Sequence, residues 1–420
     1  MRKKNNWSWV PSLYIAEGLP YAIIMTLSIA MYKDFGVSNT EIAFYTSWLY
    51  LPWVIKPLWS PFVDIFRTKR WWVMTMQTLL GVGMAGIAFA LSAPYYFKLT
   101  IAIFWIMAFC SSTHDIAIDG FYMLALDQRE QSFFIGIRST FYKIAQWLGN
   151  GALLIVVGLI QSHTSVAYSW MLVFLIMAGF FIAIMLYHRS VMPGVETVRA
   201  ERMGLDRVFG QMFEVFVSFF NKKGVVFPAL VFILVYRLGE AMLVRMKTPF
   251  LLDPLAVGGM GLTKAQCGVV DGTVGMLCMV AGGILGGYAL SRKGLKYWLW
   301  FMLLCMAVPN AVYIYLAYAQ PSSLWVTGIC VGLEQLGYGF GFTAFTLYLM
   351  YIARGKYKTS HFAISTGFMA LGMMLPGMIA GWLQEEMGYL LFFVLVFILG
   401  LVVMAVVPFL KVDPEYGKSS

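Results

Sequence analysis

Long apolar segments constrain this chain of 420 residues more than any other feature of its sequence. Each is long enough for a helix that crosses the hydrocarbon core of a bilayer, which takes about 20 apolar residues. Only 12% of the residues are charged, whereas a soluble domain carries about 25%. These proportions exclude a soluble enzyme, and we expect an all-α membrane protein with twelve transmembrane helices. The twelve apolar runs lie near 12–32, 42–66, 71–92, 99–126, 133–160, 166–187, 225–247, 265–290, 297–318, 323–352, 360–383 and 389–410.

The runs form two groups of six, separated by the longest polar stretch. We expect an N-terminal six-helix half at 1–187 and a C-terminal one at 224–410, with a central cytoplasmic loop at 188–223 and a cytoplasmic tail at 411–420. Apolar residues of the central loop recur at helical spacing from Leu205 to Phe216. This pattern predicts either a helix in the membrane interface or a helix that continues toward the seventh run.

Basic residues are distributed unequally between the two sets of loops. One set, which includes both termini, holds 21 of the 30 Lys and Arg residues, and the opposite set holds three. Because cytoplasmic loops are enriched in Lys and Arg, we expect both termini to be cytoplasmic. The net charge of +10 therefore reflects topology and gives no support to a nucleic-acid partner.

A short basic turn occurs at corresponding positions in the two halves. After the second run the turn holds Asp64, Arg67 and Arg70, and after the eighth it holds Arg292 and Lys293, about 227 residues later. Positive-inside charge explains the basic residues but not their half-chain spacing. We interpret the spacing as an internal repeat and the turns as cytoplasmic gating motifs, as in carriers whose halves rock about a midplane site.

Carboxylates interrupt the fourth run. Asp115 and Asp119 are four residues apart and therefore share a helix face. A charged side chain inside a bilayer costs free energy, so each one is expected to have a functional or structural role. Two carboxylates this close disfavour joint ionisation, which suits a proton-coupling site. The alternative is a structural contact between Asp119 and Arg129 or Arg138.

The first and seventh runs each carry an acidic residue beside a glycine. Glu17 precedes Gly18, and Glu240 follows Gly239, three residues after Arg237. Arg237 and Glu240 can pair on one helix face, and glycine loosens a helix as in the broken helices of transporters. These residues indicate a gate or a binding site, with structural pairing as the alternative.

Polar stripes mark two further runs and predict a shared water-filled cavity. Lys143, Gln146 and Asn150 form the first stripe, and the second is made of Glu334, Gln335 and Tyr338. The second run is rich in aromatic residues, including Trp53. Aromatic faces stack on sugar rings, although aromatic packing and membrane interfaces are commoner reasons for such residues.

The five cysteines lie in apolar runs and the four histidines are scattered. Neither pattern has the spacing of a metal site or a disulfide framework. The sequence also lacks a Walker loop and a nucleophile elbow. We therefore expect no catalytic residue, no metal and no cofactor.

Ordered motifs in both halves resemble those of the AmpG muropeptide permease group, within the peptide–acetyl-coenzyme A transporter family of the major facilitator superfamily. The first half carries EGLPYA, KPLWSPFVD, CSSTHDIAID and FYKIAQWLGNG. The second half carries YRLGEA, TPFLLD, GGILGGYALSRKGL, LEQLGYG and SHFAIS. Together these stretches span nearly the whole chain.

The resemblance implies proton-driven import of cell-wall fragments of the GlcNAc–anhydroMurNAc type through the bacterial inner membrane. It implies proton-coupling roles for the acidic residues of the fourth, seventh and tenth runs and substrate-binding roles for basic residues of the fifth and seventh. The residues that match these positions are Asp115, Asp119, Glu240, Glu334, Lys143 and Arg237. His114 and His361 stand where the family commonly has Gln, which adds titratable groups or signals a different ligand.

We expect a monomeric carrier that works by alternating access, with protons, the lipid bilayer and an anionic or amphipathic sugar-containing solute as its partners. Glu17, Gln146, Asn150, Trp53 and Tyr338 complete the candidate substrate-binding set. Two rival functions stay open: import of another amphiphile, such as a different glycan, a peptide, a siderophore or a coenzyme A ester, and a membrane sensor that binds without transport.

Overall fold

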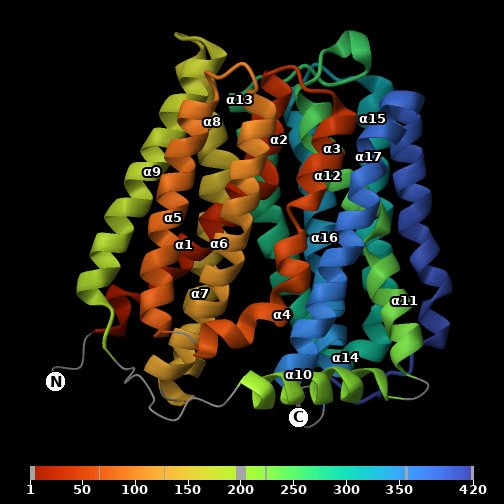
Figure 1. The fold of residues 1–420 in the computed structure, drawn as a ribbon. Helices are drawn as coiled ribbons and strands as arrows, with labels where there is room; N and C mark the ends of the chain where they lie inside the picture. Colours follow the sequence, from red (N-terminus) through yellow and green to blue (C-terminus); the bar gives the residue numbers. More distant parts are fainter. Residues whose placement is uncertain are drawn as a thin grey trace. The chain divides into compact units, whose positions relative to one another are not determined.

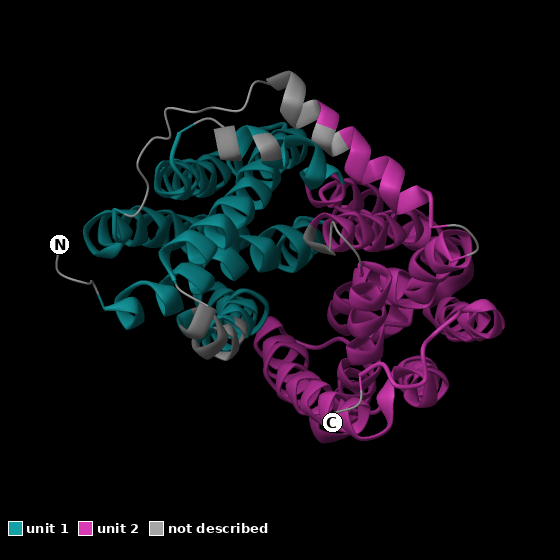
Figure 2. Cartoon of the chain, turned by 90° about the horizontal axis from the view of Figure 1, so that it is seen from below, with its two compact units in different colours: residues 1–36, 55–205 teal, residues 37–54, 206–420 magenta. Residues whose placement is uncertain are grey.

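The computed structural model describes residues 5–65, 67–126, 128–194, 205–222, 225–354 and 358–417. All regular elements within these ranges are helices, which confirms the predicted fold class (Figure 1). By their contacts the helices form two compact units, residues 1–36 with 55–205 and residues 37–54 with 206–420 (Figure 2).

Unit 1 is built from helices that pack around a core containing Trp9 and Phe121. Its helices are α1 (Val10–Ala22), α2 (Ser28–Asp34), α4 (Leu51–Ile65, from residue 55), α5 (Lys69–Ala90), α6 (Tyr96–Ala125), α7 (Gln128–Trp147), α8 (Leu153–Gln161) and α9 (Val166–Val191).

Unit 2 has a second core around Phe232 and Phe345. Its helices are α3 (Asn39–Trp48), α10 (Leu205–Phe220), α11 (Val226–Tyr236), α12 (Leu238–Leu252), α13 (Lys264–Cys267), α14 (Met276–Ala307), α15 (Ala311–Ala319), α16 (Leu324–Ile352) and α17 (Lys358–Val402).

Every predicted apolar run coincides with helical residues. Eight of the described helical stretches are long and apolar enough to cross a membrane, and two of these, 264–319 and 360–409, contain 56 and 50 residues. Both long stretches change direction at a glycine with positive φ, Gly294 or Gly388. The number of twelve crossings and the cytoplasmic position of the termini stay predictions.

The two repeated turns share a backbone feature. Arg67, between α4 and α5, has a φ of 65°, and Gly294, inside the residues assigned to α14, has a φ of 77°. These positions are 294 − 67 = 227 residues apart, the spacing found in the sequence. A left-handed residue lets the chain reverse sharply between two helices. The sequence repeat therefore coincides with a structural one.

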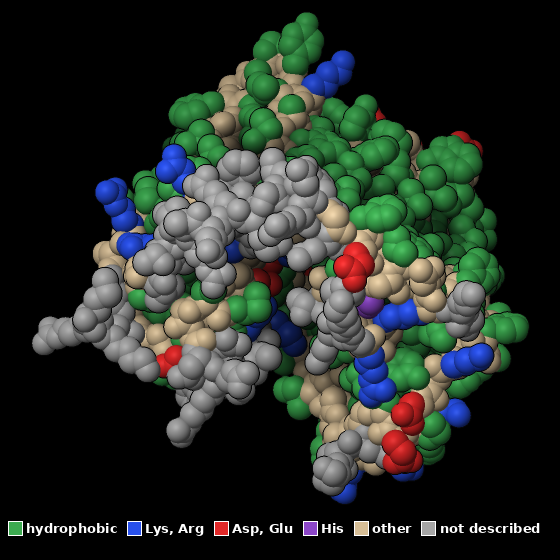
Figure 3. All heavy atoms as spheres, turned by 60° about the horizontal axis from the view of Figure 1, so that its bottom comes forward, with side chains coloured by type: hydrophobic (Ala, Val, Ile, Leu, Met, Phe, Trp, Pro, Cys, Tyr) green, Lys and Arg blue, Asp and Glu red, His purple; other side chains and the backbone are tan. Residues whose placement is uncertain are grey.

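Helix α10 is separate from the helix that follows it. It ends at Phe220, and α11 begins at Val226. In Figure 1 it lies across the lower ends of the unit 2 helices. Phe213 is 73% exposed, as expected for a helix in the membrane interface. The alternative of a continuous helix is therefore wrong. Figure 3 shows Lys and Arg side chains at this end and hydrophobic side chains along the flank.

Candidate functional site

Three carboxylates meet inside unit 1. Asp115 and Asp119 lie one turn apart on α6, and Glu17 reaches them from α1. One oxygen from each residue lies within 4.8 Å of the other two. The prediction that Asp115 and Asp119 share a helix face is confirmed, and Glu17 joins them although it was assigned from sequence to substrate binding.

Two basic side chains contact this cluster. The Nζ of Lys56 on α4 pairs with Asp115, and the guanidinium of Arg138 on α7 lies 2.8 Å from Asp119. Tyr14 donates a hydrogen bond of 3.4 Å to Asp119, and its ring lies 4.6 Å from Arg138. The structural contact between Asp119 and Arg138, weighed as an alternative from the sequence, is therefore present.

A glycine explains how Glu17 reaches the cluster. A Cβ at Gly18 would lie 2.9 Å from the carbonyl oxygen of Tyr142 and 3.0 Å from the Cβ of Ala145. Any larger residue would push α1 away from α7. The close packing holds Glu17 at 7% exposure, and its Oε2 has no hydrogen-bond partner.

The polar stripe of the fifth run lies on α7 and continues into a segment of π-helix. Lys143 and Gln146 are half-buried on α7, and Asn150 lies in the π segment Leu148–Ala152. The Oδ1 of Asn150 is buried without a partner. A second π segment, Ile23–Leu27, contacts this one, and a Cβ at Gly149 would lie 2.4 Å from that of Ala22. Such bulges occur frequently at functional sites.

His114 is buried and precedes Asp115 on α6, but its hydrogen-bond partner is outside the carboxylate cluster. Its Nε2 lies 3.1 Å from the amide nitrogen of Gln77, and that amide also contacts the Nδ1 of His188. The Nε2 of His188 lies 3.0 Å from the Oγ of Ser12. The result is a buried network that links α1, α5, α6 and α9. Sequence spacing offered no signal for it, because each of these helices contributes a single member.

Unit 2 contains an ion pair that was not predicted from the sequence. The Nζ of Lys247 on α12 lies 2.6 Å from Asp271, and the two side chains are 10% and 15% exposed. Asp271 lies in the π segment Gly268–Gly275, between α13 and α14. A charged residue inside the eighth apolar run was the available signal.

The residues of the polar stripe of the tenth run lie on α16 and make hydrogen bonds. Glu334, which is 1% exposed, accepts hydrogen bonds from Tyr313 at 3.2 Å and from the Gln335 side chain at 3.0 Å. Tyr338 accepts a hydrogen bond of 2.8 Å from Arg237. The shared cavity expected between this stripe and that of the fifth run stays a prediction.

Arg237 lies where the seventh run breaks. It separates α11 from α12, with φ −104° and ψ 18°, so the expected interruption is present. Gly239 has a different role from the one expected, because its Cβ would lie 2.6 Å from the carbonyl oxygen of Val396. It permits close approach to α17. The guanidinium of Arg237 lies 5.2 Å from the Phe342 ring.

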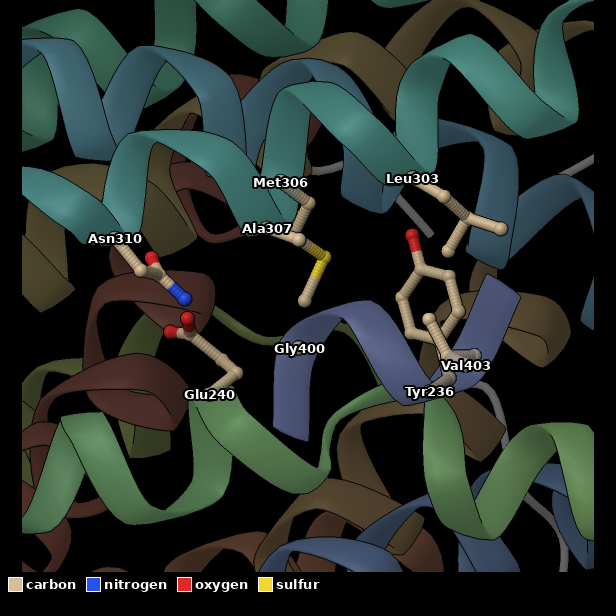
Figure 4. Close-up of a pocket in the computed structure, with 8 residues that line it drawn as sticks. All are labelled: Tyr236, Glu240, Leu303, Met306, Ala307, Asn310, Gly400 and Val403. Atoms are coloured by element: carbon tan, nitrogen blue, oxygen red, sulfur yellow. The ribbon is translucent and has the colours of Figure 1, made fainter. Parts of the chain in front are cut away.

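Glu240 lines a small cavity within unit 2. The cavity measures about 10 Å³, roughly the space of one water molecule. Figure 4 shows Glu240 and Asn310 facing each other across it, with Tyr236 and Met306 nearby. Glu240 Oε2 and Asn310 Oδ1 are buried without a hydrogen-bond partner. Glu240 is therefore a buried, incompletely satisfied acid, like Glu17 at the corresponding helix of the first half.

Two aromatic residues of the candidate substrate-binding set differ in their surroundings. The Tyr338 ring already stacks on Phe342, with centroids 5.5 Å apart and an interplanar angle of 18°. This contact favours aromatic packing for Tyr338. Trp53 on α4 is half-buried, and its role in stacking stays a prediction.

The basic residues of the repeated turns contact neighbouring aromatic rings and backbone. Arg67 lies 5.8 Å from the Trp71 ring, and Arg70 donates to the carbonyl oxygen of Arg189. Arg292 and Lys293 donate to the hydroxyls of Tyr288 and Tyr297, one turn away. The side chain of Asp64 lies outside the described residues, as do Arg199, Arg202 and Lys223 of the central loop.

A family model described as Major Facilitator Superfamily matches residues 12–360. The chain belongs to the Major Facilitator Superfamily. Among curated proteins, the anhydromuropeptide permease of Escherichia coli (strain K12) is 26% identical over 386 residues, which cover 91% of this chain and 74% of that protein. The resemblance to the AmpG group is therefore confirmed, and the chain is a membrane transporter rather than an enzyme.

Solved structures of other transporters share the fold. The nucleoside transporter NupG superposes with a TM-score of 0.71 at 16% identity, covering 96% of this chain and 99% of that one. The D-xylose-proton symporter gives a TM-score of 0.73 at 12% identity, with 99% of each chain covered.

Proposed function

We propose that this transporter imports cell-wall sugar fragments of the GlcNAc–anhydroMurNAc type across the bacterial inner membrane, driven by protons. The similarity to a permease for anhydromuropeptides over 91% of the chain supports the substrate. The buried carboxylates of both units support the coupling, because intramembrane acids in transporters serve as proton relays.

The observation that carries the proposal is the pairing of acids with bases inside apolar helices. Asp115 and Asp119 contact Lys56 and Arg138, while Glu240 and Glu334 are buried in unit 2. A sensor that does not move its ligand has no need for such groups on helices of both halves. We assign proton coupling to the two groups of buried acids to which these four residues belong, one in each unit.

We assign substrate binding to other polar and aromatic side chains of both units. Lys143 has no ion-pair partner among the described residues, so it is available to neutralise a carboxylate on the substrate. We assign the same role in the second half to Arg237, which donates a hydrogen bond to Tyr338. Gln146 and Asn150 offer hydrogen bonds to sugar hydroxyls, and Trp53 offers a ring for stacking. Alternating access follows from movement of the six-helix halves 1–187 and 224–410 as a monomer with cytoplasmic termini.

Uptake into proteoliposomes tests the proposal. Purified protein receives labelled GlcNAc–anhydroMurNAc under an imposed inward proton gradient. We expect accumulation by the wild type and its loss in Asp119→Asn, because the amide removes one negative charge from the three-carboxylate cluster and with it the excess charge that a bound proton would neutralise. Glu386→Gln is the matched control, since Glu386 is exposed and lies outside the candidate site. Gradient-independent uptake would contradict coupling, and no uptake by folded protein would contradict the substrate.

A further inference from the structure

We infer that Glu17 is the residue of unit 1 that binds and releases the coupled proton. The inference rests on the proton coupling proposed above and identifies where it acts. It differs from the expectation from the sequence, which placed coupling on Asp115 and Asp119 and assigned Glu17 to the substrate.

The charges in the cluster do not balance. Three carboxylates lie together, and two basic side chains contact them. Lys56 forms an ion pair with Asp115, and Arg138 forms one with Asp119. The third carboxylate, Glu17, has no basic residue in contact with it among the described ion pairs. When all five groups are ionised the cluster carries one excess negative charge, and one bound proton removes it.

The surroundings of Glu17 favour its neutral form. Its side chain is 7% exposed and its Oε2 has no hydrogen-bond partner. An ionised carboxylate is strongly destabilised in such a place, whereas a neutral carboxyl is tolerated. Glu17 also lies within hydrogen-bonding reach of Asp115. Two ionised carboxylates cannot make that bond, because neither carries a donor, but a protonated Glu17 can donate to Asp115.

Five titratable groups surround Glu17: two acids on α6, one amine on α4, one guanidinium on α7 and one phenol on α1 itself. In order, these are Asp115, Asp119, Lys56, Arg138 and Tyr14. The imidazole of His188 on α9 bonds to Ser12, closer to the start of α1. The nearest bases are already paired with other acids, so Glu17 must be neutralised by an added cation.

A proton suits this place better than a metal ion. Lys56 and Arg138 already occupy sides of Asp115 and Asp119 where a metal would coordinate. A divalent ion would turn the excess of one negative charge into one positive charge. On binding, a proton from the outer water adds to the Glu17 carboxylate and gives a neutral carboxyl. On release the proton passes to water on the inner side, and the carboxylate returns.

Infrared spectroscopy tests the proposal without any substrate. The carboxyl C=O band of protein in liposomes is followed in a pH titration, for the wild type, Glu17→Gln, Glu17→Asp and Glu386→Gln. We expect the wild type and Glu386→Gln to show a band that disappears with rising pH. Glu17→Gln should lose it, and Glu17→Asp should retain it at a shifted midpoint. Thermal melting confirms that each variant is folded.

Transport of GlcNAc–anhydroMurNAc supplies a second readout. Glu17→Gln should lose accumulation driven by a proton gradient, whereas the exposed control Glu386→Gln should retain it. A titrating band that survives in folded Glu17→Gln overturns the proposal. A second result would also overturn it: Na⁺ stabilises the wild type but not Glu17→Gln, and the wild type shows no titrating band. The site would then bind a metal cation. If the wild type takes up no substrate, the substrate proposed above fails, and the infrared result alone decides on Glu17.

Discussion

Individual charges inside this chain are held by partners from other helices, and the partner determines what each charge can do. Lys247 and Asp271 show the structural case, since they contact each other at 2.6 Å and are mostly buried. Lys56 and Arg138 show a second case, in which bases on two helices contact two of three clustered acids. The acid left over, Glu17, is the group free to exchange a proton. The role of Glu17 therefore follows from the excess of acids over bases in the cluster.

Removal of one member of the Lys247–Asp271 pair should destabilise unit 2. Lys247→Met leaves the Asp271 carboxylate buried without its countercharge, and we expect the free energy of unfolding to fall by about 3–5 kcal/mol. The double variant Lys247→Met/Asp271→Leu should recover most of this loss, because it removes the uncompensated charge. Unfolding in mixed detergent micelles measures both. An equal fall in the free energy of unfolding in the single and double variants would show that the two residues do not depend on each other.

At the scale of helices, sequence periodicity predicted most elements because the bilayer requires long apolar helices. The four-residue spacing of Asp115 and Asp119 placed them on one face, and the half-chain repeat located the left-handed turns at Arg67 and Gly294. The contact of Asp119 with Arg138 was one alternative from the sequence, but most partners from separate helices were not predictable. Tertiary packing alone brings Asp271 to Lys247 and Glu17 to Asp115. Such contacts have no characteristic spacing in the sequence. The three π segments also lacked a signal, since one extra residue per turn barely alters an apolar pattern.

Glycines set how closely α14 and α16 pack. A Cβ at Gly282 would lie 2.1 Å from the backbone oxygen of Leu336, whereas a Cβ at Gly287, on the same helix, meets nothing within 4 Å. Gly282→Ala should therefore force the helices apart and lower the free energy of unfolding by about 1–3 kcal/mol. Gly287→Ala should be neutral or stabilise by up to about 1 kcal/mol, because alanine favours the helix. Thermal melting in detergent compares the two. A similar effect of both substitutions would show that the helix contact tolerates a methyl group.

At the scale of the whole molecule, residues 37–54 depart from the division expected from the sequence. They are continuous with unit 1 along the chain, yet their contacts place them in unit 2. A Cβ at Gly381 on α17 would lie 1.9 Å from the carbonyl oxygen of Asn39. The Thr40 amide and hydroxyl both donate to Glu385, and Arg245 donates to Thr46 at 3.0 Å. Helix α3 thus packs against α17 and α12 and forms hydrogen bonds to both. The helix that follows it, α4, belongs to unit 1 from residue 55.

Because this segment joins one unit by contact and the other by covalent continuity, we expect the contact between α3 and α17 to open and close as the two halves move. We predict that cross-linking Thr40→Cys to Glu385→Cys with a short bifunctional thiol reagent, in a chain whose five native cysteines are replaced by serine, abolishes uptake. Reduction of the cross-link should restore it. Each single cysteine variant, treated alike, controls for modification. Full uptake by completely cross-linked protein would show that α3 remains attached to α17 throughout the cycle, and the moving boundary would then lie at the break between α3 and α4.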